Sequence, residues 1–182
     1  MKFSVKERRL VSRLQMRGSN VSVAARNFET PLGEISLSQG PTKRNNPQAM
    51  ANGHQEWNFD SKCAPRAVIF EVVDDSHLLA RLIKTGVRGE VEGVPFEVRA
   101  RSALLPKNRK VDFLGGIGTF KFRTNGFRVH VGDERGVVMA TANSVANWNA
   151  STVPTPELLI VIVMFVALDA NFFMQSPLWR NF

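Results

Sequence analysis

The sequence predicts a mainly β protein, a single domain of roughly ten to twelve antiparallel strands in a barrel or a sandwich, followed by one apolar helix. Three observations predict it. Apolar and polar residues alternate along most of the chain, as in strands with one buried face and one face in water. Turn signals separate these runs at short intervals. A continuous apolar stretch, residues 158–168, then breaks the alternation.

The alternating runs are spread through the chain as far as residue 141. In each run, every second residue is apolar, so a core on one side of a sheet accounts for the pattern. The clearest runs are residues 21–26, 67–72, 96–99, 120–123 and 127–131, and weaker ones lie near 9–16, 33–38, 78–84 and 110–113.

Short turns join these runs into hairpins. Asn125-Gly126 is the strongest signal, because a type I′ turn needs positive φ at both central residues. Glu92-Gly93 joins residues 87–91 to 94–101, and residues 132–136 join 127–131 to 137–141. The glycines of residues 115–118 match neither phosphate-loop spacing, so we interpret them as a β-turn.

Residues 40–65 interrupt the pattern. They are rich in Pro, Gly and Asn and poor in large apolar residues, which indicates a long surface excursion. The composition shows no linker between two folded units, so residues 1–182 are predicted to be one domain.

A helix is predicted over about residues 156–174. Thr155 is a suitable N-cap, and Pro156 and Glu157 suit the first helical turn. A helix that is apolar all round must be buried on all sides, and a protein core is the favoured site. Insertion in a membrane is an alternative, but a span needs about 20 apolar residues and Asp169 interrupts this one. A buried strand is the other alternative.

The chain is basic, with 24 Lys and Arg against 16 Asp and Glu. The excess lies in residues 1–50 and 101–150. Such blocks attract phosphate groups of nucleic acid or of anionic lipid, although a solvated surface without a ligand also accounts for them. The candidate ligand-binding residues are the two clusters Arg8 and Arg9, and Lys107, Arg109 and Lys110.

The sequence predicts no catalytic residues, no metal site and no cofactor. One cysteine and three histidines do not provide a zinc site or a disulfide framework. Asp75, Ser76 and His77 are adjacent at an expected hairpin tip, where triad residues do not converge on one substrate atom. Because the N-terminal residues contain no signal-peptide pattern, we expect an intracellular, cytoplasmic protein in which Cys63 is a free thiol.

Residues 158–177, LLIVIVMFVALDANFFMQSP, resemble the C-terminal helix of phospholipid scramblases, in which Asp and paired phenylalanines follow an apolar run. Residues 87–99 and 127–140 resemble hairpins of the same superfamily, the tubby-like proteins, which also includes LURP-one-related proteins. The resemblance implies a closed antiparallel β-barrel of about twelve strands that encloses the C-terminal helix. It also implies association with phosphoinositide-containing membranes and, for scramblases, phospholipid movement and calcium.

One departure from the scramblase pattern removes the expectation of calcium. An acidic, calcium-loop-like stretch precedes the helix in scramblases, whereas this chain has no acidic residue between Glu134 and Glu157. We therefore expect a non-enzymatic barrel that binds anionic phospholipid head groups, peripherally at a membrane surface. The alternatives are a nucleic-acid-binding module that uses the same basic faces, a phospholipid scramblase, and a structural or partner-binding domain.

Overall fold

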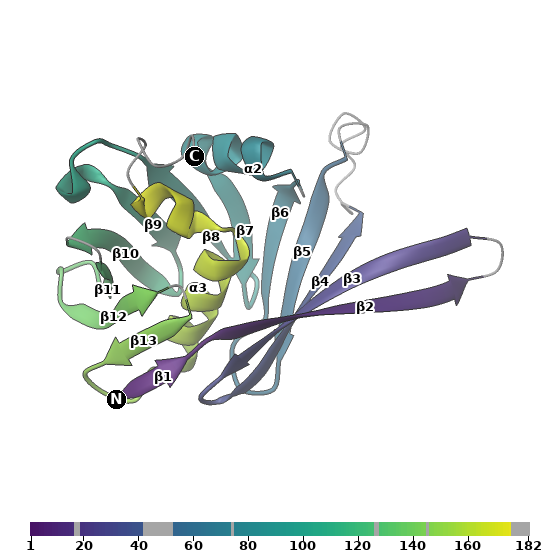
Figure 1. Ribbon diagram of the computed structural model, residues 1–182, viewed down its shortest axis with the longest axis horizontal. Coiled ribbons are helices and arrows are strands. Elements are labelled where there is room, and N and C mark those ends of the chain that lie inside the picture. Colours follow the sequence, from purple (N-terminus) through teal and green to yellow (C-terminus); the bar gives the residue numbers. More distant parts are fainter. Residues whose placement is uncertain (17–18, 42–52, 74, 126–127, 145, 176–182) are drawn as a thin grey trace.

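The structure is a computed structural model that describes residues 1–16, 19–41, 53–73, 75–125, 128–144 and 146–175, with the side chains of 9–25 and 41 left out. One antiparallel sheet of thirteen strands nearly closes into a barrel around a helix (Figure 1). The strands are β1 (Lys2–Ser4), β2 (Lys6–Met16), β3 (Ser19–Thr30), β4 (Gly33–Pro41), β5 (Gln55–Ser61), β6 (Ala67–Val72), β7 (Val87–Val91), β8 (Val94–Arg101), β9 (Lys110–Gly115), β10 (Gly118–Asn125), β11 (Arg128–Gly132), β12 (Val138–Ser144) and β13 (Asn147–Ala150). The helices are α2 (Ser76–Thr85), α3 (Pro156–Ala167) and the 3-10 helices η1 (Pro106–Asn108) and η2 (Ala170–Met174).

The N-terminal run of chain brings the two edges of the sheet together. From β2 to β13 each strand pairs with its neighbours in sequence, and β1 pairs with β13. Val5 alone separates β1 from β2, and its N–H still donates to Ala146 O across 2.9 Å. The same run thus pairs first with β13 and then with β3. The predicted mainly β, antiparallel barrel with a C-terminal helix is confirmed, but the sheet has thirteen strands where about twelve were expected, and it nearly closes where a closed barrel was expected.

The barrel has two ends, because the connections of an antiparallel sheet alternate between its sides. The helix-entry end carries the β3–β4, β5–β6, β7–β8, β9–β10 and β11–β12 connections and the start of α3. The helix-exit end carries α2, η1, η2 and the β8–β9 connection (Figure 1).

α3 fills the barrel, as its uniformly apolar sequence requires. Every residue from Leu158 to Phe165 is at most 2% exposed. The ring of Phe165 stacks on Phe122 with centroids 4.2 Å apart, and Trp148 packs edge-on against both rings. The prediction of a buried core helix is confirmed, and the strand alternative is wrong. None of the helices in the described ranges has both the length and the apolar character to cross a membrane.

The helix is shorter than the predicted 156–174. α3 ends at Ala167, and Asp169 adopts the left-handed conformation with φ 49° before η2 begins. Aspartate is among the few residues that visit this conformation readily, and a left-handed residue cannot continue a right-handed helix. Asp169 therefore separates two helical segments.

Residues 78–84, predicted as a weak strand after a hairpin tip, form most of α2 instead. The Asp75 carboxylate accepts hydrogen bonds from the N–H groups of His77 and Leu78, at 2.9 and 2.8 Å, and is thus a helix N-cap. Leu79 and Ile83, four residues apart, are the buried residues of α2. A spacing of four residues is typical of one helix face. The sequence did not indicate the helix because a short apolar run fits a strand equally well.

The predicted excursion over residues 40–65 is shorter in the structure. β4 extends to Pro41, and β5 pairs with both β4 and β6. Residues 42–52 lie outside the described ranges. The Glu92–Gly93 turn is confirmed, with positive φ at both residues, and β10 pairs with β11 as predicted, although Gly126 lies outside the described ranges.

Candidate anion-binding surface

The structure does not bring the two predicted basic clusters together. Arg8 lies in β2 opposite Asn27, near the helix-entry end, where its guanidinium pairs with Glu29 at 2.7 Å. The backbone of Arg9 follows in β2, but its side chain is outside the description. Lys107 lies in η1 at the helix-exit end. A single site therefore does not contain both clusters.

Arg109, the third predicted contact at the helix-exit end, is buried with only 6% of its surface exposed. Its guanidinium donates to three backbone carbonyls, those of Ala103 (2.8 Å), Leu104 (2.7 Å) and Met174 (3.2 Å). The planar fork of an arginine suits several acceptors at once. Arg109 thus ties the β8–β9 connection to the end of η2, and its guanidinium does not lie on the surface beside Lys107 and Lys110.

Strand register instead aligns three cations from three strands. Arg101 of β8 lies opposite Lys110 of β9, which lies opposite Arg123 of β10. Cross-strand partners project from the same face of a sheet. The neighbouring Val111 is fully buried in the core, so the three cations lie on the outer face. We call Arg101, Lys110 and Arg123 the basic row. Sequence reasoning missed Arg101 and Arg123, because it predicted no pairing between residues 94–101 and 110–113 and did not derive the register of these strands.

Asp112 partly balances the basic row. Its carboxylate contacts Arg123 Nη1 at 2.6 Å and Lys110 Nζ at 3.4 Å, and the residue is 8% exposed. The outer face of β8–β11 nevertheless has a large excess of positive charge. Its acidic residues are Glu97 and Asp112, and its basic residues are Arg99, Arg101, Lys110, Lys121, Arg123 and Arg128.

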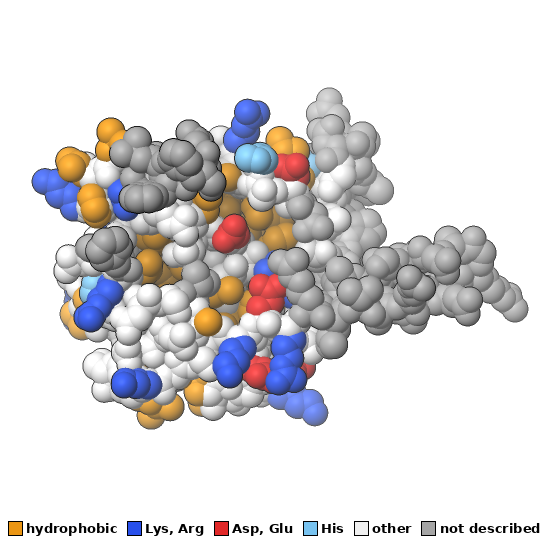
Figure 2. Space-filling view, in the orientation of Figure 1, with side chains coloured by type: hydrophobic (Ala, Val, Ile, Leu, Met, Phe, Trp, Pro, Cys, Tyr) orange, Lys and Arg blue, Asp and Glu red, His pale blue; other side chains and the backbone are white. Residues whose placement is uncertain are grey.

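Two exposed leucines adjoin the basic row. Leu104 is 65% exposed and Leu105 is 56% exposed, and both lie in the β8–β9 connection just before Lys107. Figure 2 shows hydrophobic and basic side chains side by side at the upper left, over this connection. The surface thus combines cations with large exposed apolar groups, and exposed apolar groups rimmed by polar residues are typical of protein or membrane interaction sites.

A second charged cluster closes the C-terminal end of α3. Arg26 donates to both carboxylate oxygens of Glu7, at 2.8 and 3.1 Å, and to Ala167 O at 3.0 Å. Its guanidinium also lies within 6 Å of the rings of Phe28 and Trp57. A cation at the negative end of the helix dipole is stabilising. Because its donors are engaged within the protein, this cluster is structural.

The carboxyl group of Asp169 lies beside this cluster, and its raised pKa makes the free energy of unfolding depend on pH. Although the residue has an exposed surface, partial burial of the carboxyl raises its pKa above the ordinary 3.8, while Arg26 lowers the pKa and Glu7 raises it. The folded protein thus keeps this proton to a higher pH than the unfolded chain does. The contribution of Asp169 to the free energy of unfolding falls as pH rises from 3.8 through the folded-state pKa.

Asp169→Asn removes this titration and keeps a residue that tolerates the left-handed conformation. We expect the variant to be more stable than the parent at neutral pH, by less than about 1 kcal/mol because the group is partly solvated. The advantage disappears below pH 3.8. Thermal unfolding over this pH range measures it, and a variant less stable at neutral pH contradicts the assignment.

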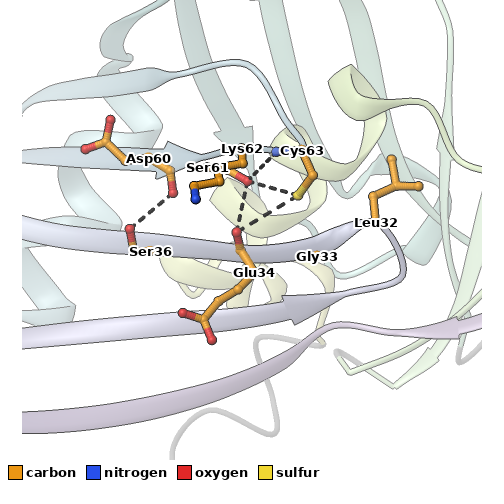
Figure 3. A pocket seen from close by; sticks show the side chains of 8 residues that line it. All are labelled: Leu32, Gly33, Glu34, Ser36, Asp60, Ser61, Lys62 and Cys63. Atoms are coloured by element: carbon orange, nitrogen blue, oxygen red, sulfur yellow. Dashed lines mark hydrogen bonds between the residues drawn. The ribbon is translucent and has the colours of Figure 1, made fainter.

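An open groove of about 550 Å³ lies at the helix-entry end, between the β3–β4 turn and the end of β5. Ser61 Oγ donates to Glu34 O and accepts from Cys63 N (Figure 3). The free thiol of Cys63 lies 2.9 Å from Ser61 Oγ. The Ser61 proton is thus held by a carbonyl, and no histidine lines the groove. Over the described part of the chain, no three His, Cys, Asp or Glu side chains are placed to hold a metal ion. The hydrogen bonds of Ser61 and Cys63 therefore stabilise the turn after β5, and they do not form a catalytic arrangement.

No family model, no curated protein and no solved structure matches the chain.

Proposed function

We propose that the protein is a non-enzymatic, tubby-like β-barrel that binds anionic phospholipid head groups at a membrane surface. The observation that carries the proposal is the alignment of Arg101, Lys110 and Arg123 on one outer face, beside Lys107. Each cation near an anionic membrane surface contributes about 1 kcal/mol. Four cations with one buried acidic neighbour, Asp112, are expected to give reversible binding that weakens as salt is added.

The exposed leucines favour a membrane over a nucleic acid. Both ligands carry phosphates that a basic surface attracts. Leu104 and Leu105, however, gain free energy only where apolar surface is removed from water, as at the boundary between head groups and acyl chains. The helix inside the barrel is the feature that supports the tubby-like assignment.

Co-sedimentation with phosphatidylcholine vesicles, with and without phosphatidylserine, tests the proposal. We expect binding only to the anionic vesicles, weakening as salt is added. The double variant Arg101→Glu/Lys107→Glu is expected to bind at least about thirtyfold more weakly, because each cation contributes about 1 kcal/mol and each new carboxylate repels the membrane.

Arg8→Glu/Lys62→Glu is the matched control, because it changes the net charge equally with exposed residues near the helix-entry end. We expect a much smaller loss from this variant. Equal losses from the two variants, or equal binding to neutral vesicles, would contradict the proposed surface. Retention of RNA or DNA at low salt without any vesicle binding would assign the basic row to nucleic acid.

A further inference from the structure

The β8–β9 connection exposes two adjacent leucines at the tip of a loop. Leu104 and Leu105 are more than half exposed, whereas most large apolar side chains in the described ranges are buried. Their exposure is not a consequence of strand alternation, because they lie between β8 and η1. We call residues 103–108 the leucine wedge.

The backbone of the leucine wedge is fixed by hydrogen bonds. Four consecutive carbonyls, those of residues 103–106, each accept one from within the same connection. The pairs are Arg109 Nε to Ala103 O at 2.8 Å, Arg109 Nη2 to Leu104 O at 2.7 Å, Asn108 N to Leu105 O at 3.1 Å and Arg109 N to Pro106 O at 2.9 Å.

These hydrogen bonds lower the free-energy cost of moving the leucine wedge into an environment with little water. Below the head groups, each backbone carbonyl without a donor costs several kcal/mol. In this loop the carbonyls at the tip already have donors, and Pro106 has no N–H that needs an acceptor. The loop also loses little conformational entropy on insertion, because η1 and Arg109 have ordered it in advance.

The charges around the wedge indicate the kind of membrane. Lys107 follows the leucines by two residues, and the cross-strand partners Arg101 and Lys110 lie on either side of the connection that carries them, so these cations stay close to the leucines. The pair Val137 and Val138 at the opposite end is exposed to a similar degree, 61% and 49%, but the turn that precedes it carries two acidic residues, Asp133 and Glu134, and one basic residue, Arg135. Of these two exposed pairs, the leucine pair is the one whose neighbouring charges are all basic, which matches an anionic bilayer.

We infer that the leucine wedge inserts Leu104 and Leu105 into the boundary between head groups and acyl chains of an anionic membrane, while the basic row contacts the lipid phosphates. This inference rests on the proposed binding of anionic membranes and adds the inserted element and the orientation. The helix-exit end of the barrel then faces the bilayer.

The double variant Leu104→Ser/Leu105→Ser tests the energetic part of the inference. We expect its affinity for phosphatidylserine-containing vesicles to fall at least about tenfold, since each leucine loses burial of its apolar surface. The remaining binding should keep the salt dependence of the parent, because the cations are unchanged. Val137→Ser/Val138→Ser is the matched control and is expected to bind as the parent does.

A fluorescent label tests insertion directly. In a Cys63→Ser background, the environment-sensitive dye NBD is attached to Leu104→Cys or, as control, to Val137→Cys. We expect anionic vesicles to shift the emission of the label at 104 to the blue and lipid-borne quenchers to reduce it, with no change at 137. An unchanged label at 104, with salt-sensitive binding intact, would overturn the wedge alone. Absence of any vesicle binding by the parent would overturn the wedge and the proposed function together.

Discussion

Phe165→Ala is expected to lower the free energy of unfolding by about 3–5 kcal/mol, the range for removing a large buried aromatic side chain. The Phe165 ring is 1% exposed, and its contacts with Phe122 and Trp148 join α3 to the surrounding strands. Aromatic pairs add about 0.5–1.5 kcal/mol to the burial of apolar area. Since the strands are hydrogen-bonded around the helix, they cannot collapse readily into the cavity.

Urea denaturation followed by circular dichroism measures this loss, with two control variants. Phe165→Leu keeps most of the volume and should cost less than Phe165→Ala. Phe172→Ala removes the same atoms from a half-buried position in η2 and should also cost less. If Phe172→Ala cost as much as Phe165→Ala, the enclosure of α3 by the sheet would be contradicted.

Arg109→Ala is the second change with a large expected effect, a loss of about 2–4 kcal/mol in the free energy of unfolding. Three carbonyls lose their donor, and the hydrogen bond to Met174 O is fully buried, where water does not replace it. The same change should release the leucine wedge from its fixed shape. We therefore expect weaker vesicle binding from the part of the variant that remains folded.

Two neighbouring substitutions separate the roles of charge and shape. Arg109→Lys keeps the charge but loses the planar fork, so it should recover only a small part of the stability. Lys107→Ala, at an exposed position, should leave stability unchanged and reduce vesicle binding. Full recovery by lysine, or a stability loss from Lys107→Ala equal to that from Arg109→Ala, would contradict these assignments.

The elements with strong local signals were predictable from the sequence. The Glu92–Gly93 turn joins β7 and β8 at the predicted residues, and the all-apolar run after Thr155 is a buried helix. α2 was missed because its short apolar run fits a strand as well as a helix, and because the N-cap Asp75 resembles a turn residue. The error at α2 arose because the local sequence is compatible with both a strand and a helix.

The candidate surface was predictable only in part, because its geometry depends on contacts between distant residues. A basic loop at residues 107–110 was evident, but the burial of Arg109 depends partly on the carbonyl of Met174, 65 residues away. The basic row depends on the register of β8, β9 and β10. Register is a property of paired strands, so net charge per segment does not reveal it.

The position of α3 in the chain has a consequence for biosynthesis. The segment that fills the barrel follows all thirteen strands, and β1 must wait for β13 before its backbone is paired. A nascent chain therefore exposes the apolar faces of many strands until translation has passed residue 167. Contacts of such high contact order form slowly, so we expect emerging chains to rely on ribosome-associated chaperones to avoid aggregation.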